Sequence, residues 1–166
     1  MNSAKPVVVA AGAGKNVSVI GNSITIKVHG RDTGGTLCVV ESTDAPGDGP
    51  PPHVHQREDE TFCVLEGEYE FMCDGKRFPA KKGAIIFAPR AIPHGYKSIG
   101  PAVGKMVLTI TPAGFEGFFE EVGALSVEQQ EIPKVIAIGK KYGLEFLPPP
   151  NSQTHGPLQT IIPHSL

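Results

Sequence analysis

The stretch Gly47-Asp48-Gly49-Pro50-Pro51-Pro52-His53-Val54-His55-Gln56-Arg57-Glu58-Asp59-Glu60, followed by Gly67, decides how this chain folds. His53 and His55 lie two positions apart, so on an extended strand both imidazoles point to the same face. The polar residues 56–59 form a turn, and Glu60 then opens an apolar run, 60–65, that is typical of a strand. The segment therefore predicts two strands that bring two imidazoles and one carboxylate together.

A second stretch, 83–94, gives another strand, a proline-rich turn and a third histidine, His94. Three imidazoles and one carboxylate form a ligand set suited to a divalent transition metal. The alternative is a solvent-exposed His-x-His pair in a proline-rich loop, but the turn, the strands and His94 favour the metal site. The competing carboxylate, Glu58, lies inside the turn, and we expect it to be solvated.

Composition narrows the class of protein. The 166 residues suit one domain, and the net charge of −2 comes from basic and acidic residues scattered along the chain. Without a basic stripe, a nucleic-acid partner is not expected. No apolar run approaches the roughly 18–20 residues of a membrane span, and the N-terminal apolar run 7–11 is a poor signal peptide. We therefore expect a cytoplasmic protein with no membrane association.

Turn-forming residues are abundant, with 20 Gly and 16 Pro, and this favours an all-β domain over a helical one. Alternating Ile24, Ile26 and Val28 predict a half-buried strand, and Asp74-Gly75 predicts a type I′ hairpin turn. Seven or eight short strands are expected before residue 112, as in a sandwich or barrel. The three cysteines are widely spaced and fit reduced thiols rather than disulfides.

After Pro112 the pattern becomes helical. Phe115, Phe118, Phe119 and Val122 recur at helical spacing, and Pro133 suits the first turn of a second helix. We expect a lead-in at 1–16, a barrel at 17–112, a helical segment at 113–150 and an extended tail at 151–166. The helices are expected to cap one end of the barrel or to pack at a subunit interface.

These motifs resemble the cupin superfamily, whose members are small jelly-roll β-barrels. The first cupin motif is filled at every fixed position, by Gly47, His53, His55, Glu60 and Gly67. In the second motif Gly83, Pro89 and His94 match, whereas Ala91 replaces a glycine and Ser98 an asparagine. The resemblance implies an all-β fold, a single cupin jelly-roll barrel with one or two C-terminal helices, and it is most similar to small quercetin-dioxygenase-like members.

The resemblance implies that His53, His55, Glu60 and His94 surround one divalent transition metal ion, and the ligand set leaves Fe, Mn, Ni, Co, Cu and Zn as alternatives. Glu60 would also act as the catalytic base. The expected activity is that of an oxidoreductase, a quercetinase-like dioxygenase that uses O2 on an aromatic or enediol small molecule. The alternatives are a metal-dependent isomerase, epimerase or lyase that uses no O2, and a non-catalytic cupin that binds a small ligand. Relatives of this type also imply a homodimer.

Strand parity suggests which side chains line the substrate pocket. Phe62 shares the inward parity of Glu60, Tyr96 shares that of His94, and Tyr69 and Phe71 are expected to face inward from the hairpin. For each of these aromatic residues taken alone, simple filling of the barrel core is the favoured interpretation. Together they predict a mostly apolar substrate cavity.

Overall fold

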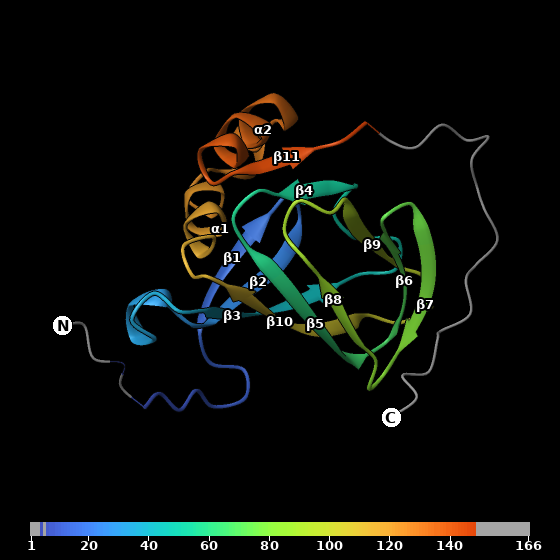
Figure 1. Cartoon of the computed structure of the whole chain (residues 1–166), viewed down its shortest axis with the longest axis horizontal. Helices are drawn as coiled ribbons and strands as arrows, with labels where there is room; N and C mark the ends of the chain where they lie inside the picture. The colour runs from blue at the N-terminus through green and yellow to red at the C-terminus, as the bar shows by residue number, and fades with distance from the viewer. Residues whose placement is uncertain (1–3, 5, 149–166) are drawn as a thin grey trace.

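Two antiparallel β-sheets form the body of the protein in this computed structural model, which describes residue 4 and residues 6–148. The first sheet has the strand order β1 (Lys15–Val19), β2 (Asn22–Val28), β3 (Cys38–Asp44), β10 (Gly104–Thr111), β5 (Asp59–Glu66), β8 (Ile85–Ala88). The second has the order β11 (Leu144–Phe146), β4 (His53–His55), β9 (His94–Ser98), β6 (Glu68–Cys73), β7 (Lys76–Lys81). The two sheets pack as a jelly roll, so the expected all-β class is confirmed (Figure 1).

Alternating burial along the strands builds the core. In β3 every second residue from Cys38 to Asp44 is buried, and β10 repeats the pattern from Gly104 to Ile110. Because side chains alternate between the two faces of a strand, this pattern directs one face of each strand into the space between the sheets. Val40, Val64, Met106 and Ile110 are almost fully buried there.

The hairpin between β6 and β7 confirms the predicted turn. Asp74 and Gly75 both have positive φ, of 52° and 71°, as a type I′ turn requires. Phe71 pairs with Phe78 across the hairpin, and the other edge of β6 pairs with β9. The turn thus sets the register of β7 against β6, the strand on which Tyr69 and Phe71 lie.

Among the described residues, ten strands precede residue 112, so the expected count of seven or eight was too low. The ten include the short strand β4, which the spacing of His53 and His55 predicted, and β9. Proline and glycine surround both segments, and histidine and glycine within them give little strand signal. These short strands form because β4 pairs with both β9 and β11, partners distant in sequence.

Two helices lie against one end of the two-sheet body, α1 (Glu116–Gly123) beside β1 and α2 (Ile132–Lys141) beside β11 (Figure 1). Ser126 and Gln129 form a capping box at the short 3₁₀ turn η2 (Val127–Gln129), and another 3₁₀ turn, η1, spans Gly30–Asp32. Pro133 lies in the first turn of α2, as expected. The expected tail, 151–166, lies outside the described residues.

Gly143 ends α2, and β11 then pairs with the histidine-bearing strand β4. In this register Leu144 faces His55 and Phe146 faces His53. The backbone N–H of Gln56 donates to the carbonyl oxygen of Gly143 at 2.9 Å and extends the connection. The helical segment is therefore hydrogen-bonded to the strand that carries two of the candidate metal ligands.

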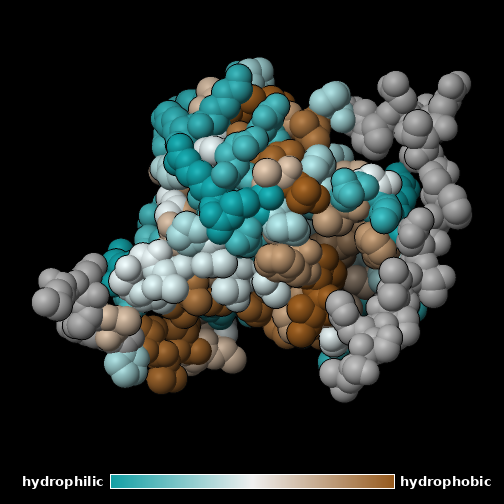
Figure 2. All heavy atoms as spheres, viewed as in Figure 1, coloured by the Kyte–Doolittle hydropathy of each residue, from teal (hydrophilic) through white to brown (hydrophobic). Residues whose placement is uncertain are grey.

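Surface chemistry differs between regions. Figure 2 shows mostly hydrophilic surface over the helices and apolar surface near β8. On β8, Ile85 and Phe87 are 70% and 59% exposed. Within the described part of the chain, no helix is long and apolar enough to cross a membrane.

Candidate metal centre and its cavity

The four expected ligands come together at one point between the sheets. His53 and His55 lie on β4, Glu60 is the second residue of β5, and His94 opens β9 opposite His53. One ligand atom from each residue lies within 4.8 Å of the other three, and all four side chains are buried. Ligand atoms about 2.1 Å from a common ion are at most about 4.2 Å apart, so small side-chain rotations would close this cluster on a cation.

One carboxylate oxygen, Oε2 of Glu60, faces all three imidazoles. It lies 2.8 Å from Nε2 of His94, 3.4 Å from Nε2 of His55 and 4.0 Å from Nε2 of His53. Because all three rings turn Nε2 inward, the donor set is three neutral imidazole nitrogens and one carboxylate oxygen. This combination suits Fe, Mn, Ni, Co, Cu or Zn and could hold a divalent metal ion.

Electrostatics at the cluster follow from burial and from these short contacts. Burial, assisted by neighbouring His94 and His55, lowers the pKa of His53 to about 3, so this ring is neutral at physiological pH. Burial alone would raise the pKa of Glu60, but the imidazoles of His55 and His94 lower it to about 2. Burial would likewise lower the pKa of His94, yet its hydrogen bond to Glu60 raises it. In the 2.8 Å contact between Nε2 of His94 and Oε2 of Glu60, each group therefore stabilises the charged form of the other.

The backbone around the cluster is held by specific contacts. Nδ1 of His53 lies 2.8 Å from the carbonyl oxygen of Pro51, and Nδ1 of His94 lies 2.9 Å from that of Ile92. Ala91, which replaces the motif glycine, adopts a positive φ of 63°, and its N–H donates to the carbonyl oxygen of His55 at 2.8 Å. The turn that the family builds with glycine is thus made here with alanine. Ser98, which replaces the motif asparagine, is buried.

Glu58 lies where the sequence did not predict it. We expected a solvated carboxylate, but its side chain is buried, and Oε2 lies 3.5 Å from Nδ1 of His55. The turn folds inward at this point, whereas its neighbours Gln56 and Arg57 are exposed. The identity of Glu58 alone could not show this, because acidic residues in turns are usually solvated.

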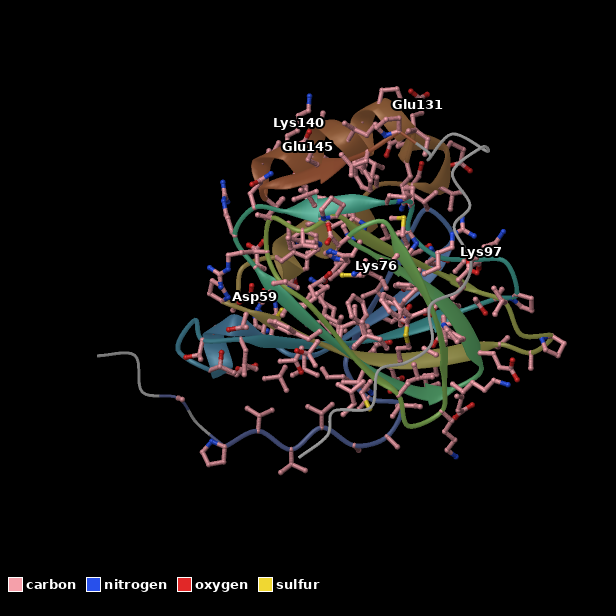
Figure 3. The ribbon with its side chains drawn as sticks, turned by 45° about the vertical axis from the view of Figure 1, so that its right-hand side comes forward. Asp59, Lys76, Lys97, Glu131, Lys140 and Glu145 are labelled. Carbon is pink, nitrogen blue, oxygen red and sulfur yellow. The ribbon has the colours of Figure 1, made fainter. Side chains whose placement is uncertain are left out.

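A cavity of about 520 Å³ opens from the cluster. His53, His55 and Glu60 form its polar end, and Phe62 and Tyr96 line it from the barrel. The helical segment supplies a large apolar part of the remaining wall, through Phe115, Phe118, Phe119, Ile132, Val135, Ile136, Leu144, Phe146 and Leu147. The rest comes mainly from β1, β2 and their turn and from the loop 47–51. None of the described residues that line this cavity is Lys or Arg. The outer side of the helical segment, by contrast, is charged, as Glu131, Lys140 and Glu145 show (Figure 3).

Two of the expected pocket residues, Tyr69 and Phe71, do not line the cavity. Both are almost fully buried in the core, and the Phe71 ring packs 5.3 Å from that of Tyr96. The hydroxyl of Tyr69 donates to Oδ2 of buried Asp44 at 2.9 Å, and that of Tyr96 donates to Oδ1 at 3.3 Å. Parity correctly directed these side chains inward, but this part of the barrel is filled, and the open space lies toward the helices.

The helical residues in the wall were missed as pocket residues. The spacing of Phe115, Phe118 and Phe119 indicated a buried face, and the structure buries all three. That spacing does not say whether the face packs tightly or leaves a space. Of these three residues, Phe115 contacts the candidate metal ligands, with its ring centroid 4.3 Å from that of His55 in an edge-to-face arrangement.

The fold and cluster define a two-sheet β-roll with a possible His₃Glu metal site at one mouth. A family model for the cupin domain matches residues 40–110. The chain is 30% identical over 122 residues, 74% of its length, to quercetin 2,3-dioxygenase of Bacillus subtilis, and 28% identical over 67 residues, 40% of its length, to polyketide synthase CurC of Streptomyces cyaneus. It spans 36% and 44% of the length of these two proteins.

Solved structures show the same fold. KdgF from a Halomonas species superimposes with a TM-score of 0.61 at 20% identity, over 68% of this chain and 99% of that one. This likeness agrees with the family match and with the complete first motif. The chain is therefore a small protein of the cupin superfamily.

Proposed function

We propose that this protein is a metal-dependent oxygenase of the quercetinase-like kind, which uses O2 on an aromatic or enediol small molecule. One observation carries the proposal: a His₃Glu cluster opens directly onto an apolar cavity of about 520 Å³. The likeness to the Bacillus subtilis quercetin dioxygenase supports the same reaction class. A cavity of this size suits a drug-sized ligand, which apolar walls would surround while a few polar groups orient it.

The cavity wall favours particular substrates. With no Lys or Arg among its described lining residues, it offers no partner for phosphate or for several carboxylates. Aromatic faces of Phe62, Tyr96 and Phe115 would instead contact a flat ring. We therefore expect a neutral, mostly apolar substrate that presents one acidic hydroxyl to the polar end.

In the proposed reaction, His53, His55, Glu60 and His94 hold the ion, which when bound would supply Lewis acidity toward a substrate hydroxyl. Glu60 is the carboxylate in reach of that hydroxyl's proton. Because the pKa of Glu60 is lowered to about 2, the group is ionised at neutral pH and holds a proton only weakly. It therefore suits substrates whose own hydroxyl is acidic, such as enediols and hydroxylated aromatic rings. The apolar walls would exclude water from the reacting atoms.

Oxygen consumption tests this proposal. Metal-loaded protein is mixed with a panel of flavonols, catechols and enediols in an oxygen electrode, with oxalate as an anionic comparison. We expect uptake with at least one aromatic or enediol compound, none with oxalate, and none from the His53→Ala variant. No uptake with any compound at full metal occupancy would contradict the oxygenase.

A second candidate is a lyase, isomerase or cyclase reaction that uses no O2. It is favoured by the likeness to polyketide synthase CurC, since a polyketide would also fit an apolar cavity beside a metal ion. The two candidates differ in one measurement. Turnover of a substrate that continues unchanged under strictly anaerobic conditions would establish the second reaction class and overturn the first.

A further inference from the structure

The three imidazoles of the cluster differ in what holds their outer nitrogen. His53 and His94 each turn Nδ1 toward a backbone carbonyl oxygen two residues earlier, that of Pro51 at 2.8 Å and that of Ile92 at 2.9 Å. His55 has no such carbonyl. Its Nδ1 is buried and makes no hydrogen bond within the described chain. The group that faces it is Oε2 of Glu58, at 3.5 Å.

Glu58, which faces His55, also has a buried polar atom without a hydrogen-bond partner among the described residues. That atom is Oε2, and the side chain that carries it is about 5% exposed. An unpaired buried carboxylate is costly, so a group in this position is expected to serve a facing donor. Arg90, the nearby cation that its charge influences, is already engaged with Asp59 through Nε at 3.0 Å and Nη2 at 2.7 Å.

Coordination chemistry explains why these two atoms face each other. A neutral imidazole that binds a metal through Nε2 must carry its proton on Nδ1, and that N–H needs an acceptor to fix the ring and its tautomer. We infer that Glu58 is a positioning residue, which accepts the Nδ1 proton of His55 and so fixes that ring for the metal ion. The inference rests on the proposed metal site but not on the reaction performed there. Closing the gap from 3.5 Å to an ordinary hydrogen bond needs only a small rotation.

The charge of Glu58 adds a second effect. An acceptor carboxylate makes the ligating nitrogen more basic than a carbonyl acceptor does. It also places a carboxylate on the outer side of the His55 ring, opposite Glu60, where its negative charge would help to balance a divalent ion at the centre. His55 would then be the strongest imidazole donor of the three, because its outer nitrogen alone faces a charged acceptor.

Zinc binding tests the inference without any activity measurement. The affinity for Zn²⁺ is measured by competition with a chromophoric chelator for the full chain and for the variants Glu58→Ala, Glu58→Gln and Gln56→Ala. Loss of a carboxylate that supports a ligand histidine typically weakens metal binding about 10- to 100-fold, and we expect this for Glu58→Ala. Glu58→Gln keeps an oxygen acceptor and should lose less. Gln56→Ala removes an exposed side chain of the same turn and should change nothing.

The Nδ1–H signal of His55 gives a second measurement. It would not change if Glu58 had only a structural role. In ¹⁵N-labelled, zinc-loaded protein, we expect a slowly exchanging Nδ1–H signal from His55. Glu58→Ala should lose this signal, while those of His53 and His94 remain and Glu58→Gln retains it. The melting temperature of each metal-free variant reports any loss of folding separately.

Two results would overturn the inference. The first is an affinity of Glu58→Ala for Zn²⁺ that equals that of the parent protein. The second is a His55 Nδ1–H signal that is unchanged in that variant. A lower melting temperature with unchanged zinc affinity would assign Glu58 a structural role alone. Failure of the oxygenase proposal looks different: the parent protein binds metal and shows the Glu58 effects, yet consumes no O2.

Discussion

Glu60 is the residue on which the metal centre converges, since its Oε2 is within 4.0 Å of Nε2 of each of the three histidines. Four titratable groups buried so close together are costly without a cation or shared protons to balance them. The 2.8 Å contact between Nε2 of His94 and Oε2 of Glu60 offsets part of this cost. A divalent cation held by the four ligand atoms would offset the rest.

Removing one ligand should release the metal and leave the fold intact. We expect His94→Ala to lose most of its bound metal after dialysis, because a weaker three-ligand site replaces a four-ligand one. Metal content by mass spectrometry and far-ultraviolet circular dichroism check the two halves of the prediction. His29→Ala is the matched control, since His29 pairs with Glu116 and Glu120 away from the cluster. Full metal content in His94→Ala would remove His94 from the ligand set.

Asp44 makes stability depend on pH. Burial raises its pKa from 3.8, although the hydroxyls of Tyr69, Ser42 and Tyr96 donate to it and lower the pKa in part. Folded Asp44 thus binds its proton more tightly than the unfolded chain does, and its contribution to stability is lost as pH rises through the raised pKa. We expect the free energy of unfolding of the metal-free parent protein, relative to Asp44→Asn, to fall as pH increases upward from about 3.8.

Urea denaturation of both proteins across a pH series measures that difference. If the parent protein instead gains stability over Asp44→Asn as pH rises, the hydroxyl hydrogen bonds outweigh burial and the sign is wrong.

Residue-level patterns in the sequence predicted much of the cluster. The two-residue spacing of His53 and His55 follows directly from strand geometry, and the motif added Glu60 and His94. Glu58 was misplaced because nothing in its local sequence distinguishes a turn that folds inward from one that faces solvent. Tyr69 and Phe71 were placed inside correctly, but parity does not show where a barrel interior is filled.

At the scale of elements, local signals predicted the hairpin β6–β7 and both helices. Asp74-Gly75 and the helical spacing of Phe115 and Phe118 are contained in a few consecutive residues. Strand β11 was missed for the opposite reason. It has three residues, and its pairing with β4 joins segments some ninety residues apart. Such a strand depends on its partner more than on its own sequence.

The turn before β9 gives a stability prediction. Ala91 has a φ of 63°, a conformation that costs an L-residue about 1–2 kcal/mol. Ala91→Gly removes that strain but adds about 0.4–1 kcal/mol of unfolded-chain entropy, so we expect a net gain of about 0.5–1 kcal/mol. Chemical denaturation measures it. Ala102→Gly is the control at an exposed position without positive φ and should destabilise. A loss of stability in Ala91→Gly would contradict the strained turn.

At the scale of the whole molecule, the cavity forms only where the barrel strands and the helical segment pack against each other. Barrel strands supply its polar end, and the helical segment encloses it because β11 is joined to β4. No single segment predicts an open volume, since that depends on how closely distant faces pack. The sequence therefore indicated that the helices cover one end of the barrel or pack at a subunit interface, but not that they line a cavity.

Unpaired strand edges favour association of two copies of this chain. Sheet edges at β1, β7 and β8 leave backbone N–H and C=O groups without strand partners in the described chain, and β8 also exposes Ile85 and Phe87. We expect a homodimer in solution. Light scattering coupled to size-exclusion chromatography should then give twice the chain mass of 17.6 kDa. A constant mass of 17.6 kDa across the accessible concentration range would contradict this expectation.

Anomalous diffraction from a crystal of metal-loaded protein, recorded on both sides of the absorption edge of the metal, tests the central claim most directly. The account predicts one strong anomalous peak per chain, about 2.0–2.2 Å from Nε2 of His53, His55 and His94 and from a carboxylate oxygen of Glu60. A peak elsewhere, or none at this position in protein that carries one metal ion per chain, would contradict it.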